Sequence, residues 1–372
     1  MGALIKDSNM EKIKISLNQP TITKKDIDHF KKSLKPELFS FLSRKVIKEF
    51  EDKFASYIGR KYAVTCTSGT TALHLALMAL GVEEGEEVMC PSYVSVALLH
   101  AINYLKAKPK LTDCNFDIEK GDFNISFPDV KNKISSKTKA IIVPHMFGYP
   151  AEIDKIIGLG VPVIEDATLS LGGSYHNKKI GNFGEISLFS FHYSKMMTTG
   201  EGGILLTDSK ELFEKIRFLA DKESTVISQR LDSRPEYHVQ YNYMMNGLGS
   251  VLGISQLSQL DGFVKKRKEI AHIYSQQLKN ITEVPVLFKD NIFWRYIIKT
   301  KRDSQEVIKE GLKYGIQFGR GVYPPLHKYL KMDDELFPNT KKTISSIIAV
   351  PLYPSLNKKE IRYIIETLKK TL

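Results

Sequence analysis

One lysine stands between an apolar run and a glycine-rich turn, in the segment FSFHYSKMMTTGEGG at residues 189–203. A lysine amine can form a Schiff base with an aldehyde, and its surroundings tune how readily it does so. Most lysines, however, are solvated surface charges. Lys195 is therefore a catalytic candidate only if the rest of the chain supplies the other groups that this chemistry needs.

Two further segments carry residues of the required types. The run TSGTTALHLALMALG, residues 67–81, resembles a strand end followed by a helix start, whose free amides favour a phosphate. The run VPVIEDATLS ends a buried-looking strand with Glu165 and Asp166, at a place where α/β folds bind ligands. An ordinary helix cap and a surface carboxylate pair are the alternative interpretations.

Together these segments supply what pyridoxal phosphate requires. A lysine holds its aldehyde, an aspartate faces its pyridine nitrogen and a helix start holds its phosphate. The chain has neither a GxGxxG fingerprint nor a GxxxxGK[ST] loop, so dinucleotide and P-loop nucleotide binding find no support. His145 and His327 show no metal-ligand spacing, and we expect no metal site.

The elements that would position these groups follow a strand-then-helix order. From about residue 45 this alternation indicates an α/β fold with a largely parallel sheet covered on both faces. The strand-like runs EISLFSF and GGILLTD are joined by the lysine turn instead of a long helix. Residues 245–278 resemble one long helix. We expect an N-terminal arm and helix at 1–44, a large domain at 45–260 and a small domain at 261–372.

Composition narrows the class of protein. Hydrophobic residues make up 42% and charged residues 26% of the 372 residues, and no stretch is long and apolar enough to span a membrane. Three cysteines outside any CxxC pattern favour a reduced, cytoplasmic protein. The net charge of +12 favours anionic partners. The densest basic cluster, residues 265–268, is expected on a solvated helix face and not to bind nucleic acid.

At the level of whole motifs the chain resembles the DegT/DnrJ/EryC1/StrS family of pyridoxal-phosphate sugar aminotransferases. The resemblance runs from ISLNQPTITKKDI to PLYPSLNKKEI, which is nearly the full length. SFHYSKMMTTGEGG resembles the family's Schiff-base motif, and TSGTTALHLAL resembles its phosphate motif. EDATLSLGG, TKAIIVPHMFGYPAEID and VYPPLHKY also follow family patterns. The resemblance implies fold type I, with a mostly parallel large domain and a smaller C-terminal α+β domain.

The resemblance also implies roles for individual residues. Lys195 would hold the cofactor covalently and then move a proton during turnover. Asp166 would stay ionised and keep the pyridine nitrogen protonated through a charge-assisted hydrogen bond. The backbone at Gly69 and Thr70, together with the Ser190 hydroxyl, would receive the phosphate.

The implied reaction needs two substrates and two copies of the chain. An amino acid, L-glutamate in the family, would leave its amino group on the cofactor as pyridoxamine phosphate. That group would pass to a ketosugar, usually one linked to a nucleotide diphosphate. Asn242 matches a family asparagine that reaches the phosphate from the neighbouring subunit, which implies a homodimer with shared active sites.

Several positions depart from the family pattern. Leu169 stands where the family usually has glutamine or histidine, and Ser95 where it commonly has an aromatic residue that stacks on the cofactor. Tyr93 is the nearest aromatic residue, but its position suggests the opposite face. Met244 replaces an arginine, and KPELFSFLSRKV replaces a turn rich in glycine and threonine. We expect an altered substrate or reaction, with the cofactor retained.

Two other functions stay open. A pyridoxamine-phosphate-dependent sugar dehydratase of the same family would generally carry histidine in place of Lys195. A non-catalytic regulator would be favoured by loss of Lys195 or Asp166, and both are present. Of the remaining candidates, His192 could touch the substrate, but we expect a packed or capping residue. We expect Phe293 and Trp294 to lie in the core of the small domain and not to form a stacking platform.

Overall fold

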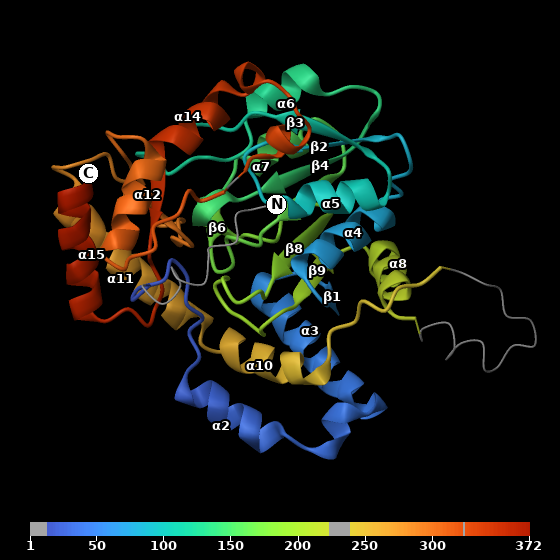
Figure 1. Ribbon diagram of the computed structural model, residues 1–372. Helices are drawn as coiled ribbons and strands as arrows, with labels where there is room; N and C mark the ends of the chain where they lie inside the picture. The colour runs from blue at the N-terminus through green and yellow to red at the C-terminus, as the bar shows by residue number, and fades with distance from the viewer. Residues whose placement is uncertain (1–12, 223–238, 323) are drawn as a thin grey trace, which may run out of the picture.

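A mixed sheet organises the larger part of the molecule (Figure 1). The computed structural model describes residues 13–222, 239–322 and 324–372, so the first twelve residues of the predicted arm and Tyr323 of VYPPLHKY lie outside the described residues. Within the described residues, the seven strands of this sheet follow the order β1-β9-β8-β5-β4-β2-β3. Their bounds are Tyr62–Cys66 (β1), Glu87–Pro91 (β2), Lys108–Thr112 (β3), Thr138–Pro144 (β4), Val163–Asp166 (β5), Ile186–Ser190 (β8) and Gly203–Thr207 (β9).

Most neighbouring strands of the sheet are parallel. β2 pairs in parallel with β3 and β4, β4 with β5, and β5 with β8, whereas β9 runs antiparallel to both β1 and β8. β5 and β8 are buried along their whole length, as expected for parallel strands covered on both faces. The predicted α/β class with a mostly parallel sheet is confirmed, and so is the short connection between β8 and β9.

The helices of this region pack on the sheet and on one another. α4 is the helix that matters most for the site, because it contacts β8, β9, α5 and α8 and is buried on nearly every side. Apolar residues all round a helix are what such a central position requires. The helices of this region are α3 (Arg44–Ile58), α4 (Gly69–Ala79), α5 (Ala97–Tyr104), α6 (Phe127–Lys133), α7 (Ile153–Ile157) and α8 (Lys210–Ala220).

The C-terminal part has its own apolar cluster and its own small sheet. β10 (Tyr296–Lys299) pairs antiparallel with β11 (Ile347–Val350). Figure 1 shows α11, α12 and α15 grouped together on one side of the molecule. The helices of the C-terminal part are α11 (Leu260–Leu278), α12 (Ser304–Lys313), α13 (Leu326–Tyr329), α14 (Pro338–Ser346) and α15 (Lys358–Thr371). The domain boundaries given above stay predictions.

Two expectations about this region were wrong. The predicted helix over 245–278 is two helices, α10 (Gly247–Leu257) and α11, separated at Ser258 and Gln259. The Gln259 side chain accepts a hydrogen bond from Thr23 and donates one to Asp26, so long-range contacts occupy the break. Arg267 of the basic cluster is only 4% exposed. Helical spacing places Arg267 on the same face as the buried residues three and four positions away. The prediction that the whole basic cluster is solvated is therefore wrong for Arg267.

The N-terminal segment runs along the outside of the molecule. After α2 (Lys24–Ser33), the stretch KPELFSFLSRKV forms two short 3-10 turns, Pro36–Phe39 and Phe41–Ser43, before α3 begins. None of the helices described is both long and apolar enough to cross a bilayer.

Candidate active site

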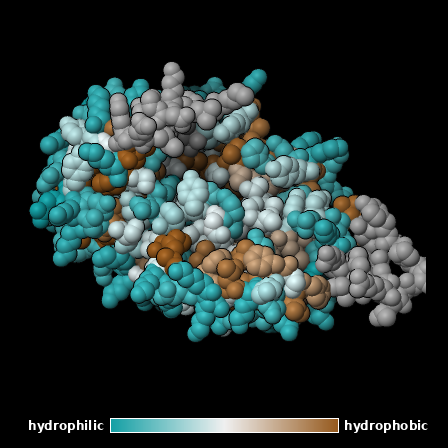
Figure 2. Space-filling model, turned by 60° about the horizontal axis from the view of Figure 1, so that its bottom comes forward, coloured by the Kyte–Doolittle hydropathy of each residue, from teal (hydrophilic) through white to brown (hydrophobic). Residues whose placement is uncertain are grey.

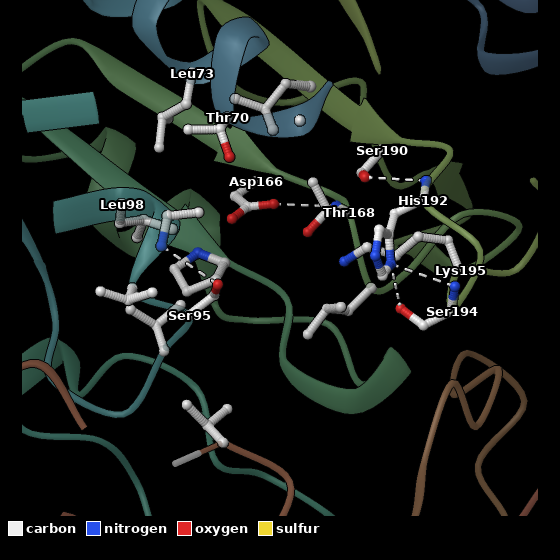
Figure 3. Close-up of a pocket in the computed structure, with 18 of the residues that line it drawn as sticks. Thr70, Leu73, Ser95, Leu98, Asp166, Thr168, Ser190, His192, Ser194 and Lys195 are labelled. Atoms are coloured by element: carbon white, nitrogen blue, oxygen red, sulfur yellow. Dashed lines mark hydrogen bonds between the residues drawn. The ribbon is translucent and has the colours of Figure 1, made fainter. Parts of the chain in front are cut away.

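A cavity of about 440 Å³ opens where β5 and β8 end and α4 begins (Figure 3). Its lining brings together five of the six residues singled out in the sequence, and these five come from three separate segments of the chain. The sixth, Asn242, does not line the cavity and is exposed in this single chain. The five that line it are Gly69, Thr70, Asp166, Ser190 and Lys195.

One end of the cavity has the properties of an anion-binding site. The Ser68 hydroxyl caps α4 by accepting a hydrogen bond from the amide of Thr71 at 3.1 Å. Within the described part of the chain, the amides of Gly69 and Thr70 donate to no protein group. The hydroxyl of Ser190 lies beside them, and a Cβ added at Gly69 would come within 2.9 Å of the Ser190 Cβ. Free amides, a helix N-terminus and a hydroxyl in such close approach fit a phosphate group.

The two carboxylates at the end of β5 point to different surroundings, as alternation along a strand requires. Asp166 lines the cavity, and its Oδ1 accepts a hydrogen bond from the amide of Thr168 at 3.1 Å. Among the described residues, its Oδ2 has no hydrogen-bond partner. That oxygen is available to a protonated ring nitrogen. Figure 3 shows Asp166 facing the hollow between Thr70 and Lys195.

Glu165 has a structural position instead. Its side chain is fully buried, and it accepts hydrogen bonds from the ring of His145 at 3.1 Å and from the amides of Gly181 and Phe183 at 2.6 and 2.8 Å. Burial alone would raise the pKa of Glu165, but these hydrogen bonds hold it below its usual range. Only Asp166 of the pair is therefore left for a ligand.

Lys195 lies in the turn that follows β8, where its amide donates to the carbonyl of His192 at 2.9 Å. Its amine is 5.4 Å from the centre of the Trp294 ring and, within the described residues, donates no hydrogen bond. Burial lowers the pKa of Lys195 to about 8, while Asp166 opposes the shift and Arg295 adds to it. A useful fraction of this amine is thus neutral, and so nucleophilic, near neutral pH.

Trp294 corrects the expectation that it belongs to the core of the small domain. It lines the cavity, and its ring N–H donates to the carbonyl of Ser194 at 2.9 Å. Phe293 does lie in the C-terminal apolar cluster, as expected. His192 also lines the cavity, with Nδ1 2.9 Å from the hydroxyl of Ser194. Sequence reasoning missed Trp294 because its contact with Ser194 spans a hundred residues and leaves no local pattern.

The positions that depart from the family pattern divide into two groups. Ser95 and Leu169 line the cavity, so they are placed to change what it accepts. Met244 lies in a different hollow, beside Arg44 and Arg217. Tyr93 is buried, and its hydroxyl donates to the carbonyl of Arg320 at 2.8 Å. Tyr93 does not line the cavity and cannot stack on a ring bound there.

Metal binding gains no support from the side-chain geometry. Among the described residues, no three side chains of histidine, cysteine, aspartate or glutamate are grouped closely enough to hold an ion. His145 contacts Glu165, and His327 contacts Ser92 and Asp334 elsewhere in the fold.

The lowered pKa of Lys195 predicts how its amine reacts in cofactor-free protein. Pulse labelling with acetic anhydride between pH 6 and 10, read by peptide mass spectrometry, should give a midpoint near pH 8 for Lys195. Ordinary lysines titrate near about 10.4. Because Asp166 favours the charged amine, Asp166→Asn should move the Lys195 midpoint to lower pH. A Lys195 midpoint equal to that of surface lysines would contradict the assignment.

Comparisons with known proteins identify the family of the chain. The sequence profile of the DegT/DnrJ/EryC1/StrS aminotransferase family matches residues 20–369. GDP-perosamine synthase from Escherichia coli O157:H7 is 32% identical over 368 residues, covering 96% of this chain and 98% of that protein.

Two solved structures share the fold. The sugar aminotransferase Spr1654 from Streptococcus pneumoniae, described as putative and in its PMP form, superposes with a TM-score of 0.83 at 24% identity over 95% of this chain and 96% of that one. The E. coli GDP-4-keto-6-deoxy-D-mannose-3-dehydratase with bound hydrated PLP gives 0.83 at 22% identity over 96% and 99%. The chain therefore belongs to the DegT/DnrJ/EryC1/StrS family and is a pyridoxal-phosphate-dependent aminotransferase of fold type I.

Proposed function

We propose that this aminotransferase moves an amino group from L-glutamate to a ketosugar linked to a nucleotide diphosphate. The observation that carries the proposal is the arrangement of one cavity, in which the Lys195 amine, a free oxygen of Asp166 and the unpaired amides of α4 meet. A relative of 32% identity that carries the name GDP-perosamine synthase supports a sugar nucleotide as acceptor.

Each residue has a task that its surroundings suit. Pyridoxal phosphate, when bound, supplies a ring that accepts the electrons left on a carbon when its proton departs. The amides of Gly69 and Thr70 and the Ser190 hydroxyl would hold the phosphate. Asp166 would hold a proton on the ring nitrogen through its free oxygen. Lys195, with its lowered pKa, would take up and return the proton at the donor's α-carbon, a contribution typically worth about 100- to 10,000-fold in rate.

A sugar dehydratase is the second candidate function. The shared fold with a GDP-4-keto-6-deoxy-D-mannose-3-dehydratase favours it, as do Ser95 and Leu169 in the cavity lining. The retained lysine, which the dehydratases generally replace, favours the aminotransferase. The two functions differ in whether the sugar gains nitrogen or loses water.

Spectroscopy of the holoprotein tests the proposal. L-Glutamate should remove the visible absorption of the bound cofactor and release one equivalent of 2-oxoglutarate. Adding nucleotide-linked 4-ketosugars should restore the absorption, and mass spectrometry should detect an aminated sugar. A visible absorption that no amino donor changes would support a non-catalytic regulator instead. Release of 2-oxoglutarate followed by a deoxygenated sugar product would support the dehydratase.

A homodimer is the second part of the proposal. Asn242 is exposed in the single chain, as a residue that serves a neighbouring subunit would be. Figure 2 views the face that carries α2 and α10 and shows apolar residues gathered there among hydrophilic ones. Exposed patches of this kind mark interaction surfaces. The large apolar side chains exposed between residues 22 and 42 are Ile22, Ile27, Leu34, Phe39, Phe41 and Leu42.

A further inference from the structure

The turn that carries Lys195, between β8 and β9, is tied to the rest of the fold on both sides of the lysine. On one side the ring N–H of Trp294 donates to the carbonyl of Ser194 at 2.9 Å. On the other side the amide of Thr198 donates to Oε1 of Gln256 at 3.2 Å. Among the described residues, these are the two hydrogen bonds that side chains from distant parts of the chain make to the backbone of this turn. Trp294 lines the cavity, whereas Gln256 lies behind it.

The orientation of the Gln256 amide is fixed by its other partners. Gln256 lies on α10 and is only 1% exposed. Its Nε2 donates to Oδ2 of Asp26 at 2.7 Å and to the carbonyl of Thr21 at 3.0 Å. A carboxylate and a carbonyl accept hydrogen bonds and do not donate them, so they hold the NH₂ end of the amide on their side. The oxygen end is thereby left to face the buried amide of Thr198.

Asp26 is itself held firmly. This carboxylate lies on α2, which packs on α10 (Figure 1), and it is only 1% exposed. Besides Gln256, the hydroxyls of Thr23 and Ser255 donate to it at 2.9 and 2.7 Å, and the amide of Gln259 donates to it at 2.8 Å. A buried polar network whose members are all satisfied favours a single arrangement of its groups. The N-terminal helix therefore fixes the side chain that reaches the lysine turn.

The residues between Lys195 and Thr198 make this anchor important. Met196 and Met197 are 4% and 1% exposed, so the turn is packed mainly through two methionine side chains. Methionine has several rotatable bonds and adapts to many shapes, so its packing alone does not fix a backbone. A directional hydrogen bond to the backbone does fix it. Burial is also what lowers the pKa of Lys195, so the reactive state of its amine depends on the turn keeping it out of water.

We propose that Gln256 is a positioning residue for the reaction, which acts through the amide of Thr198 to hold the turn that buries Lys195. The proposal rests on the role given to Lys195 in the proposed function. Asp26 takes part through Gln256, because it sets which end of the amide faces the turn. Helix α2 thus contributes to the arrangement of Lys195 and Asp166 although Asp26 does not line their cavity.

Two glutamine variants test this role in cofactor-free protein. Gln256→Met keeps the approximate size of the side chain and removes its hydrogen bonds to Thr198 and Asp26. Gln259→Met is the matched control, because Gln259 also donates to Asp26 but, among the described residues, makes no hydrogen bond to the lysine turn. In Gln256→Met the acetic anhydride midpoint of Lys195 should rise from near pH 8 by about one unit, toward the ordinary value of about 10.4. Gln259→Met should keep the midpoint of the wild type.

Hydrogen exchange gives a second measurement, which begins with the wild type and so needs no variant to fold. The amide of Thr198, resolved by fragmentation mass spectrometry, should be protected in the wild type. It should exchange about 10-fold faster in Gln256→Met, as expected for the loss of one hydrogen bond. Urea unfolding of each variant separates this local effect from global destabilisation. Asp166 and Arg295, the charged groups that shift the pKa of Lys195, are unchanged in both variants.

Three results would overturn the proposal. The first is a wild-type Thr198 amide that exchanges as fast as exposed amides. The second is a Gln256→Met protein that keeps the wild-type midpoint of Lys195. The third is an equal rise of that midpoint in Gln256→Met and Gln259→Met, which would assign the effect to general loosening of α2.

Failure of the proposed function would look different, because labelling and exchange use neither an amino donor nor a sugar. If L-glutamate leaves the cofactor spectrum unchanged while Gln256→Met still shifts the midpoint of Lys195, the positioning of Lys195 by Gln256 stands. If the glutamate half-reaction occurs, Gln256→Met should lower its kcat about 10-fold with little change in KM, since positioning affects the chemical step. A raised KM with unchanged kcat would assign Gln256 to substrate binding and overturn the positioning role.

Discussion

Replacing Lys195 with alanine is expected to lower the rate of the glutamate half-reaction by at least about 10,000-fold while the fold stays intact. The substitution removes both the group that would hold the cofactor covalently and the proton carrier, and proton transfer alone is typically worth about 100- to 10,000-fold. Among the described residues the Lys195 amine donates no hydrogen bond, so its loss leaves no protein group unpaired. The rate is measured by release of 2-oxoglutarate, and the fold by circular dichroism and urea unfolding.

A matched lysine provides the control for that experiment. Lys178 lies in a short strand, Lys178–Lys179, is exposed and lies outside the cavity lining, so Lys178→Ala should retain full activity. Borohydride should attach the cofactor to Lys195 in the wild type and in this control, and to no lysine in Lys195→Ala. Near-normal activity of Lys195→Ala would refute the assignment of the catalytic amine.

Replacing Glu165 with alanine should lower the free energy of unfolding by about 3–5 kcal/mol, the usual effect of removing one member of a buried charged network. The change would leave His145 and the amides of Gly181 and Phe183 without their acceptor in the interior. Urea unfolding monitored by circular dichroism measures the loss. Glu165→Gln should lose less, because its carbonyl oxygen can still accept one of these hydrogen bonds.

The pH dependence gives an independent check on Glu165. Its pKa is lowered in the folded protein from an ordinary value of 4.5, so its contribution to stability is full above about that pH and is lost as the pH falls further. Glu165→Gln should therefore lose less stability than the wild type between pH 5 and 3. Glu211→Gln, an exposed carboxylate in the first turn of α8, should unfold like the wild type. Equal stability of Glu165→Ala and the wild type would contradict the structural role.

Local sequence patterns were enough to single out the five predicted residues that line the cavity. Each of three features is encoded within a few consecutive residues. They are the free amides of a helix start, which can bind phosphate, a carboxylate at a strand end, and a lysine before a glycine-rich turn. The alternation of strands and helices then requires strand ends to lie at one edge of a sheet, which is where Gly69, Asp166 and Lys195 meet. The choice between Glu165 and Asp166 was implied by the family resemblance, and the hydrogen bonds of Glu165 explain it physically.

The contributions of the C-terminal part could not be predicted in this way. Trp294 reaches the site through contacts with residues about a hundred positions earlier, and nothing in FWRYII marks it as part of a cavity. The break between α10 and α11 has the same origin, because Gln259 bonds to Asp26. Periodicity describes one helix face at a time, and it cannot say which distant segment occupies that face.

Two glycines limit how this enzyme can be redesigned. A Cβ at Gly203, the last residue of the lysine motif, would come within 2.5 Å of the Ser68 carbonyl oxygen, and one at Gly69 would meet Ser190. Backbone contact thus joins the start of β9 to the cap of α4. Laboratory evolution toward new sugars can vary Ser95 and Leu169 in the cavity lining, whereas libraries that change Gly69 or Gly203 will mostly yield proteins that cannot retain vitamin B6.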